Sequence, residues 1–323
     1  MALDHISHLH GLPVHNFPRL EEPPSPLPAV ETVAWRLSVD EDRVLGETFE
    51  ESWQRFLDTV DPARVRALVL GVGAYGTEND AASPWETVKL LAGAADRLTG
   101  LEALYLADLT FEESELSWIV QDDVTPVLAA YPCLKELGVR GSGGGFDGAP
   151  GLEFHALRHE HLRVLRLENG GLPTEVAQGL AASDLPGLEH LDLWLGTEDY
   201  GRTATVADLA PVLDGGRLPS LRRLGLRNCD LQDEVAAAVA SAPVVARLSS
   251  LDLSLGTLGD VGAEALLSGQ PLTHLEELDL HHHYLSEPMM TRLREALEPF
   301  GVRVNLDERE TDDEWGRYVA AGE

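Results

Sequence analysis

One spacing of apolar residues recurs along this chain: an apolar residue is followed three and five positions later by two more. In an extended strand, the fourth and sixth residues of such a segment point to one side, and the third, fifth and seventh point to the other. One face of each strand is therefore expected to be buried. The clearest copies are LEALYL from Leu101, LKELGV from Leu134, LRVLRL from Leu162, LEHLDL from Leu188, LRRLGL from Leu221, LSSLDL from Leu248 and LEELDL from Leu275.

Weaker copies extend the series toward both ends of the chain. VETVAW begins at Val30 and VRALVL at Val65, and a last strand through Val302 and Val304, with its register starting at Pro299, would close the array. Starts of the nine copies from Val30 to Leu275 lie 26 to 36 residues apart, which is the period of a solenoid. The pattern predicts about nine to ten repeats that bury their strands only against one another.

The segments between the strands are long enough for helical crossovers, which neighbouring parallel strands require. Residues 260–267 (DVGAEALL), 233–240 (DEVAAAVA) and 207–213 (ADLAPVL) combine helix formers with apolar residues three or four apart. Asp233 and Asp260 are predicted N-caps, and Ser83, Pro84 and Glu86 fit a capping box. Residues 46–60 (GETFEESWQRFLDTV) read as the first helix.

The segment LRRLGLRNCDL, Leu221 to Leu231, resembles leucine-rich repeats of the ribonuclease-inhibitor type, including the Cys or Asn at the ninth position, here Cys229. This resemblance implies an α/β leucine-rich-repeat solenoid, or horseshoe, with a parallel β-sheet on the concave side and helices on the convex side. The other ninth positions depart from the motif, being Gly73, Leu109, Ser142, Gly170, Gly196, Gly256 and His283.

A narrower resemblance covers nearly the whole chain. HGLPVHNFP near the N-terminus, residues 115–132, LDLWLGT from Leu191 and LEPFGVRVNL from Leu297 are similar to an uncharacterised bacterial leucine-rich-repeat family. Members of that family resemble products of gene clusters that also encode radical-SAM-like, ATP-grasp-like and phosphatase-like proteins. The resemblance therefore implies a role beside such enzymes.

The repeat pattern predicts three parts. Residues 1–28 are expected to form an irregular N-terminal arm that covers the first strand, residues 29–306 the solenoid, and residues 307–323 a flexible acidic tail. The longer early repeats place their extra residues in loops, at residues 74–83 and around Trp118. These loops are either binding features or ordinary loop variation.

Charge limits the classes of partner. The formal net charge is −31, from 24 basic and 55 acidic residues, which repels a phosphate backbone and an anionic membrane. We therefore expect no nucleic-acid or membrane partner; a basic protein partner and a merely solvated surface both stay open. The N-terminal residues lack the pattern of a signal peptide, so a cytoplasmic location is predicted. Cys133 and Cys229 fall about 14 Å apart at sheet spacing and should be free thiols.

Three candidate sites lack the structural context that a functional site of their kind requires. GGGFDG, residues 143–148, has the spacing of a dinucleotide fingerprint, but Ala149, Pro150 and Gly151 follow where a helix must open. Consecutive His281, His282 and His283 alternate between strand faces and cannot meet at one metal ion. We predict no cofactor and, because no catalytic motif is present, no enzymatic activity. A histidine group without a recognised ligand spacing comprises His5, His8, His10 and His15.

Outward strand positions need not pack a core, so their identities are free to serve recognition. Trp194, with Arg166, Asp192 and Arg227 beside it, has the aromatic and arginine composition of a binding hot spot. The alternative is that a loop or the N-terminal arm folds over Trp194. The predicted binding residues are Tyr105, Arg140, Arg166, Glu168, His190, Asp192, Trp194, Arg223, Arg227, Asp252, Glu277, Asp279 and His281.

These features predict a non-catalytic scaffold that binds a protein partner, such as an enzyme encoded nearby, through its concave strand face. The alternative is an accessory subunit of a biosynthetic or modification enzyme cluster, with a small-molecule or metal site at Asp192, Asp252, Asp279 and His281. A third hypothesis is an inhibitor whose negative charge occupies a basic active site.

Overall fold

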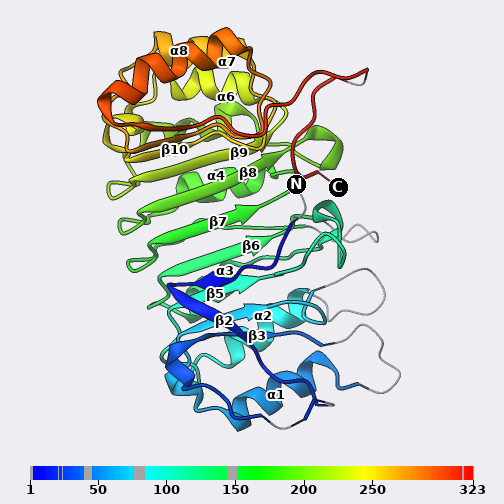
Figure 1. Ribbon diagram of the computed structural model, residues 1–323. Coiled ribbons are helices and arrows are strands. Elements are labelled where there is room, and N and C mark those ends of the chain that lie inside the picture. The colour runs from blue at the N-terminus through cyan, green and yellow to red at the C-terminus, as the bar shows by residue number, and fades with distance from the viewer. Residues whose placement is uncertain are drawn as a thin grey trace. The chain divides into compact units, whose positions relative to one another are not determined.

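The computed structural model describes residues 3–20, 22–23, 25–39, 46–75, 84–143, 151–314 and 316–322. These residues divide into two compact units. The first unit comprises residues 2–154 and 159–164, and the second comprises residues 155–158 and 165–322. In both units, strands alternate with helices along the chain (Figure 1).

The first unit holds a sheet whose strands lie in sequence order. β1 and β2 form an antiparallel hairpin, and from β2 to β6 each strand pairs in parallel with the next. Its elements are β1 (His8–Leu9), β2 (Leu12–Asn16), β3 (Ala34–Leu37), α1 (Phe49–Thr59), β4 (Ala67–Leu70), α2 (Pro84–Gly93), β5 (Ala103–Leu106), α3 (Thr125–Ala130) and β6 (Glu136–Arg140).

The second unit continues the same alternation, and its strands also lie in sequence order. β8 to β12 pair in parallel, each with the next. Its elements are β7 (Val164–Glu168), α4 (Thr174–Ala182), β8 (His190–Gly196), α5 (Ala210–Asp214), β9 (Arg223–Cys229), α6 (Gln232–Val239), β10 (Ser250–Asp252), α7 (Asp260–Ser268), β11 (Glu277–Asp279), α8 (Glu287–Leu297) and β12 (Arg303–Asn305).

Strand register agrees with the predicted template except at its two ends. Leu68 pairs with Leu104 and Leu224 pairs with Leu251, all fourth positions. In the first repeat, however, Trp35 lies opposite Leu68, so this repeat begins two residues later than the predicted Val30. Val304 likewise lies opposite Leu278, which moves the last repeat two residues beyond Pro299. A shift of two keeps the same side chains on the same face, so the pattern of apolar residues could not detect it.

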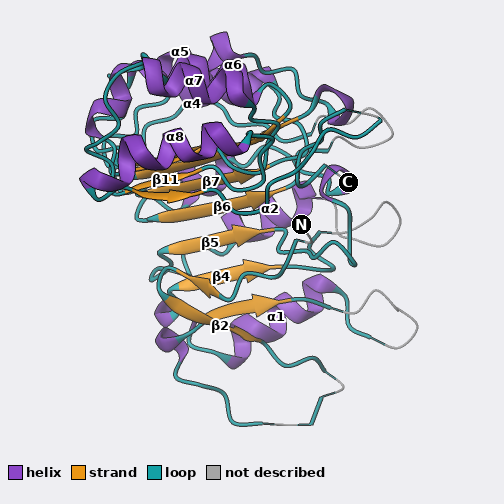
Figure 2. Cartoon of the chain, turned by 45° about the horizontal axis from the view of Figure 1, so that its top comes forward, coloured by secondary structure: helices purple, strands orange, loops and turns teal. Residues whose placement is uncertain are grey.

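The apolar core lies between the strands and the helices. In the second unit, α6, α7 and α8 lie on one side of the strands (Figure 2). The fourth and sixth template positions face that layer and are fully buried, as Leu191, Leu193, Leu251 and Leu253 show. Burying such a side chain contributes about 2 kcal/mol, which explains why the spacing persists while the residues around it vary.

Predicted helices are confirmed, but two predicted N-caps are not. α1 begins with a capping box in which Thr48 and Glu51 exchange hydrogen bonds. Asp233 instead lies in the first turn of α6 and accepts hydrogen bonds from the backbone N–H groups of Gly259 and Gly262, at 2.7 and 3.0 Å. Asp260 accepts from the N–H of Ser286 at 2.8 Å. Each aspartate thus links its own repeat to the next one.

The turns that follow the strands have no asparagine ladder, but several of them share a backbone conformation. The eighth template position has a left-handed φ in four repeats: 89° at Gly141, 52° at Asn228, 65° at Leu255 and 54° at His282. Ninth-position side chains still bond the turn backbone, because Cys229 Sγ accepts from Leu231 N at 3.3 Å. Four turns therefore share this feature without the consensus residue, whereas in other repeats the left-handed residue is at the seventh position, Ala107, or at the ninth, Gly73 and Gly196.

The N-terminal segment was predicted to be irregular, but it contains two paired strands. β1 and β2 are joined by His10 and Gly11, whose positive φ angles of 53° and 72° suit a tight two-residue hairpin loop. β2 pairs with β3, and Phe17, which follows β2, packs its ring 5.2 Å from that of Phe56. This segment covers the open edge of β3 with a paired strand.

The acidic C-terminal segment, for which a flexible tail was predicted, makes hydrogen bonds to the second unit through its described residues. Asn228, which is fully buried, donates to Ala321 O at 2.5 Å and accepts from Ala321 N at 3.0 Å. Ala320 N donates to Leu255 O at 2.8 Å, and the Tyr284 hydroxyl bonds the backbone of Tyr318. Residues 316–322 therefore run along the turns that follow β9, β10 and β11.

Three predictions fall wholly or partly on residues outside the described ranges. They are the Ser83 cap, most of the loop at residues 74–83, and GGGFDG after Gly143. Among the described residues, no helix combines the length and the apolar character needed to cross a lipid bilayer. Strands in sequence order, nearly all parallel, with helices in most of the described connections between them, are the leucine-rich-repeat fold that the sequence predicts.

Candidate functional site

We use the term open face for the side of each sheet that points away from the helices. In the first unit, the chain's own N-terminus fills this face. Leu9 packs against Ala67, Val69 and Tyr105, with Ile6, Leu12 and Val14 around them. Tyr105, predicted to be a binding residue on an exposed surface, is only 1% exposed.

A buried carboxylate, Asp108, anchors this N-terminal segment. It accepts a hydrogen bond from the backbone N–H of Ile6 at 3.0 Å, and it pairs with Arg36 and with His5 Nδ1 at 3.3 Å. Arg140, the other binding residue predicted in this unit, is 4% exposed and lies 3.8 Å from Asp108. Its guanidinium donates to the carbonyl oxygens of Leu109 and Asp4. Tyr105 and Arg140 therefore hold the chain's own arm.

In the second unit, the open face is polar, and Arg227 is at its centre. The Arg227 guanidinium lies 3.3 Å from Asp192 Oδ2 and 3.1 Å from Asp252 Oδ2, and its Nε donates to Ser254 Oγ at 3.0 Å. Burial by itself lowers the pKa of Arg227, but the surrounding carboxylates, Asp192 foremost, raise it above its usual value. Arg227 is thus held as a cation among carboxylates, and we call Asp192, Arg227, Asp252, Asp279 and His281 the polar network.

Asp192 is the most perturbed member of the polar network. It is 6% exposed, and burial raises its pKa to about 6 even though Arg227 opposes the shift. One of its oxygens, Oδ1, is buried and has no hydrogen-bond partner among the described residues. The fold therefore keeps a carboxylate whose ionised form is less stable in this environment than it would be in water.

At the other end of the polar network, Asp279 and His281 form a pair. His281 Nδ1 lies 2.7 Å from Asp279 Oδ1, and the same oxygen accepts the backbone N–H of His281 at 3.0 Å. The hydrogen bond to Asp279 raises the pKa of His281 above its usual value. His190, which starts β8, behaves in the opposite way, because burial and the nearby Arg166, Arg223 and Arg227 lower its pKa to about 4.

Trp194 was predicted to be exposed, but it lies beneath this network. It is 4% exposed, and the Arg227 guanidinium lies 5.5 Å from the centre of its ring. Its Nε1 is buried without a hydrogen-bond acceptor among the described residues. The predicted pairing of Trp194 with Arg227 is therefore present, but as an intramolecular contact.

The remaining predicted residues of this unit differ in accessibility. Arg223 is exposed, Arg166 and Glu277 are half-buried, and Glu168 is buried. Arg223 lies opposite His190 on one side and Ser250 on the other in the strand register. Several of the predicted residues on the open face are accessible to solvent. They include Arg223, which is exposed, and the half-buried Asp252, Asp279 and His281.

Three residues that shape these faces are not among the predicted binding residues. Gly225 lacks a side chain where one would collide: a methyl group there would lie 2.5 Å from Asp192 Oδ1 and 3.3 Å from Arg227 Cδ. Ser254 occupies a seventh template position and accepts a hydrogen bond from Arg227. A small serine at such a position does not stand out in the sequence as a binding residue. Asp108, an eighth position, falls outside the outward set of the template, which is why the anchor of the arm was missed.

The predicted histidine groups do not converge on metal sites. His281 faces Asp279, His282 bonds Tyr318 O at 3.2 Å and His283 bonds Leu306 O at 3.2 Å, so the prediction that these three diverge is confirmed. Near the N-terminus, His5 pairs with Asp108, and His10 lies between Glu102 and Glu136.

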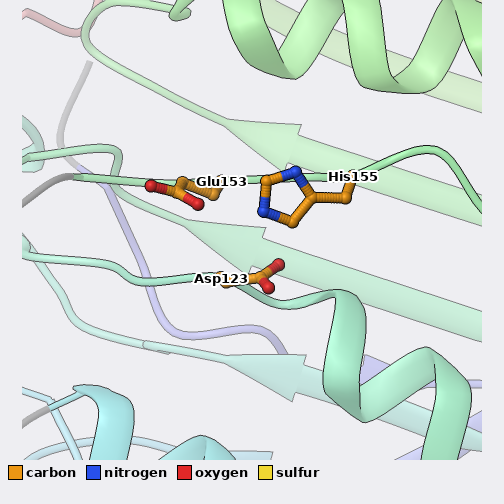
Figure 3. A group of neighbouring side chains, drawn as sticks. All are labelled: Asp123, Glu153 and His155. Atoms are coloured by element: carbon orange, nitrogen blue, oxygen red, sulfur yellow. The ribbon is translucent and has the colours of Figure 1, made fainter.

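A pair of half-buried carboxylates lies elsewhere in the first unit. Asp123 and Glu153 are on segments joined by a parallel bridge, with one oxygen of each within 4.8 Å of the other (Figure 3). Asp123 also accepts the backbone N–H of Thr125 at 2.9 Å. His155, which Figure 3 also labels, is counted with the second unit. Carboxylate oxygens suit hard cations, but two of them in one unit do not make a cation site.

The two cysteines are free thiols, as predicted. Cys133 is exposed, whereas Cys229 is buried and its pKa is raised to about 12, mainly by burial. A thiol with so high a pKa holds almost no thiolate at neutral pH and is a poor nucleophile. Cys229, the last residue of β9, therefore has a structural role, since its Sγ accepts from Leu231 N in the turn that follows.

Comparison with solved structures supports the fold. The chain is similar to a crystal structure of a protein from Bacteroides fragilis, with a TM-score of 0.75, 25% sequence identity, and coverage of 90% of this chain and 78% of that one. An alignment with an internalin from Listeria monocytogenes has a TM-score of 0.33 and 15% identity over 81% of this chain and 72% of that one, too low to carry an argument. No family model and no curated protein matches the sequence.

Proposed function

We propose that this leucine-rich-repeat protein is a non-catalytic scaffold that binds a protein partner through the open face of its second unit. Leucine-rich-repeat folds present an extended row of strand residues, which suits recognition of a protein surface. The first unit has filled its open face with its own N-terminal segment. The second unit supplies the polar surface that a partner would contact.

The observation that carries the proposal is the polar network itself. Asp192 remains buried with a pKa raised to about 6 and one oxygen without a hydrogen bond. Such a residue lowers stability at neutral pH, so the folding of the unit does not explain its presence. Perturbed ionisable groups of this kind cluster at functional sites.

The partner is proposed to be an enzyme that works beside this protein in the cytoplasm. The net charge of −31 favours a basic surface on that partner and disfavours nucleic acid and anionic membranes. The alternative metal or small-molecule site is less well supported, because the Arg227 guanidinium already lies between Asp192 and Asp252. A metal ion there would have to displace a cation.

A steric block tests the proposal without altering charge. Ser250 lies on the open face between Arg223 and Glu277, is half-buried, and is small. Ser250→Tyr would place a bulky side chain on this face. Ser268→Tyr is the matched control, because Ser268 is exposed at the end of α7 on the helical side. Both variants and the wild type would be immobilised and incubated with a lysate of the source cells, after equal thermal stability is verified.

We expect a stoichiometric partner that the wild type and Ser268→Tyr capture and Ser250→Tyr loses by at least about tenfold, which corresponds to about 1.4 kcal/mol of binding free energy. A partner that Ser250→Tyr retains in full would contradict the proposal and place binding on another surface.

A further inference from the structure

The fifth template positions of the second unit form an acidic row across neighbouring strands. Asp192 lies opposite Gly225, Gly225 opposite Asp252, and Asp252 opposite Asp279. Neighbouring strands are about 4.8 Å apart, so Asp252 and Asp279 are adjacent like charges on one face. Burial raises the pKa of Asp252, and the Asp279 carboxylate adds to that rise.

The polar network contains fewer cationic groups than carboxylates. Of the five residues of the polar network, three are aspartates and one, Arg227, is a permanent cation, which divides its guanidinium between Asp192 and Asp252. Arg166, outside the network, also acts on Asp192. His281 partly neutralises Asp279 through the 2.7 Å contact. The network therefore holds an excess of negative charge in a partly desolvated setting, where an added cation is favoured.

A second, independent observation indicates that the network is incomplete. Asp192 is more than nine-tenths buried, and its Oδ1 accepts no hydrogen bond within the described part of the chain. This oxygen points over Gly225, into the middle of the acidic row, as the 2.5 Å approach to a methyl group built there shows. The nearest contact of Arg227 is with the other oxygen, Oδ2, at 3.3 Å, so Arg227 does not satisfy Oδ1.

Asp252 and Asp279 are the accessible members of the row. Their side chains are 24% and 20% exposed, against 9% for Asp192. Each keeps one oxygen in a turn, because Asp252 Oδ1 accepts from Ser254 N and Asp279 Oδ1 accepts from His281 N, both at 3.0 Å. The other oxygen of Asp252, Oδ2, lies 3.1 Å from Arg227, so an outside donor would share it with that guanidinium. The partly exposed carboxylates of Asp252 and Asp279 form the acidic rim that an outside donor reaches first.

The geometry points to a seat for a basic side chain of the partner, an arginine or a lysine, against the carboxylates of Asp252 and Asp279. This inference rests on the proposed function and names the chemistry of the partner's contact. An arginine from the partner would relieve the repulsion between the two aspartates. It would also leave the guanidinium of Arg227 free to serve Asp192 more fully. A basic segment agrees with the strongly acidic charge of the whole chain.

The test compares two variants that each remove two negative charges. Asp252→Asn/Asp279→Asn keeps the oxygen that each turn needs and removes the charge of the seat, including the charge that Asp252 offers to Arg227 and Asp279 offers to His281. Equal folding of the variant and the wild type is verified first. Glu234→Gln/Glu295→Gln is the control, because both glutamates are exposed on the helices α6 and α8. The probe is the peptide acetyl-Gly-Gly-Arg-Gly-Gly-amide, titrated against each full-length protein by ligand-observed NMR. The same peptide with neutral citrulline in place of arginine reports contacts that do not need charge.

We expect the arginine peptide to bind the wild type and the control with equal affinity to within about twofold. Binding to Asp252→Asn/Asp279→Asn should be at least about tenfold weaker, and the citrulline peptide should bind all three proteins equally weakly. Equal binding of the arginine peptide to both variants, or of both peptides to the wild type, would overturn the seat.

The partner assay separates the two proposals. If Ser250→Tyr loses the partner and Asp252→Asn/Asp279→Asn retains it in full, the scaffold stands and the cation seat is wrong. If both lose the partner, both proposals are supported. Retention of the partner by Ser250→Tyr refutes the proposed function, and with it the seat as a partner contact.

Discussion

The open faces of the two units are built on one repeat template and end in opposite states. In the first unit the outward residues Ala34, Ala67, Val69 and Ala103 are small and apolar, and the N-terminal hairpin covers them. In the second unit many of the corresponding residues are polar or charged, and Arg227, Asp252 and Asp279 keep part of their surface in solvent.

An outward strand position can therefore become part of the apolar core or stay on the surface. The residues beside it determine which of the two occurs. A small apolar row leaves room for a second layer such as Leu9, and the layer is stabilised by the area it buries. A row of aspartates and arginines cannot be covered at low cost, because burying each charge requires a matched partner. The first unit has covered this face with its own N-terminal segment, whereas the second keeps a polar face that is partly exposed to solvent.

The largest expected effect tests the anchor of the first unit. Asp108→Ala leaves Arg36, His5 and the backbone N–H of Ile6 without their buried partner. We expect the free energy of unfolding to fall by about 3 to 5 kcal/mol, as when one member of a buried ion pair is removed. Urea unfolding would measure it. Asp96→Ala, an exposed control, should change it by less than about 0.5 kcal/mol, and an equal loss in both variants would show that Asp108 is no anchor.

A smaller effect tests the apolar layer directly. Leu9→Ala removes a side chain that is 2% exposed and packs on Tyr105, so the unfolding free energy should fall by about 2 to 3 kcal/mol. Thermal and urea unfolding would measure the change. Leu20, which is 61% exposed, provides the matched control, and Leu20→Ala should be almost neutral. A neutral Leu9→Ala would mean that the arm is not part of the first unit's core.

The smallest effect tests the polar network and has the opposite sign. Because the pKa of Asp192 is raised to about 6 in the folded protein, Asp192 contributes stability below its unfolded pKa of about 4, and this is lost as pH rises through 6. Asp192→Asn should therefore be more stable than the wild type by about 1 kcal/mol at pH 8, with the gain vanishing near pH 4. Urea unfolding at both pH values would measure it. A gain of the same size at both pH values would show that the titration of Asp192 is not its cause.

Most of the fold could be predicted because the repeat spacing reports burial directly. The fourth and sixth positions were placed correctly from Leu68 to Leu280, since only apolar residues fit between the strands and the helices. The register of the first and last repeats was missed by two residues, because a shift of two leaves the buried face unchanged. The ordered C-terminal segment was missed because its contacts, such as Ala321 with Asn228, are made by backbone groups that leave no pattern in the sequence.

For the site, the sequence by itself determined which residues share the outward side, and Asp192, Arg227, Asp252 and Asp279 are indeed neighbours there. Only the tertiary structure decided that Trp194 and Asp192 lie beneath Arg227, and that Tyr105 and Arg140 bind the chain's own arm. The physical reason is that strand periodicity fixes the direction of a side chain, which is a local property. The exposure of a side chain depends on which distant segment lies over it. The position of that segment is set by contacts between residues far apart in the chain, such as the hydrogen bond from Ile6 to Asp108.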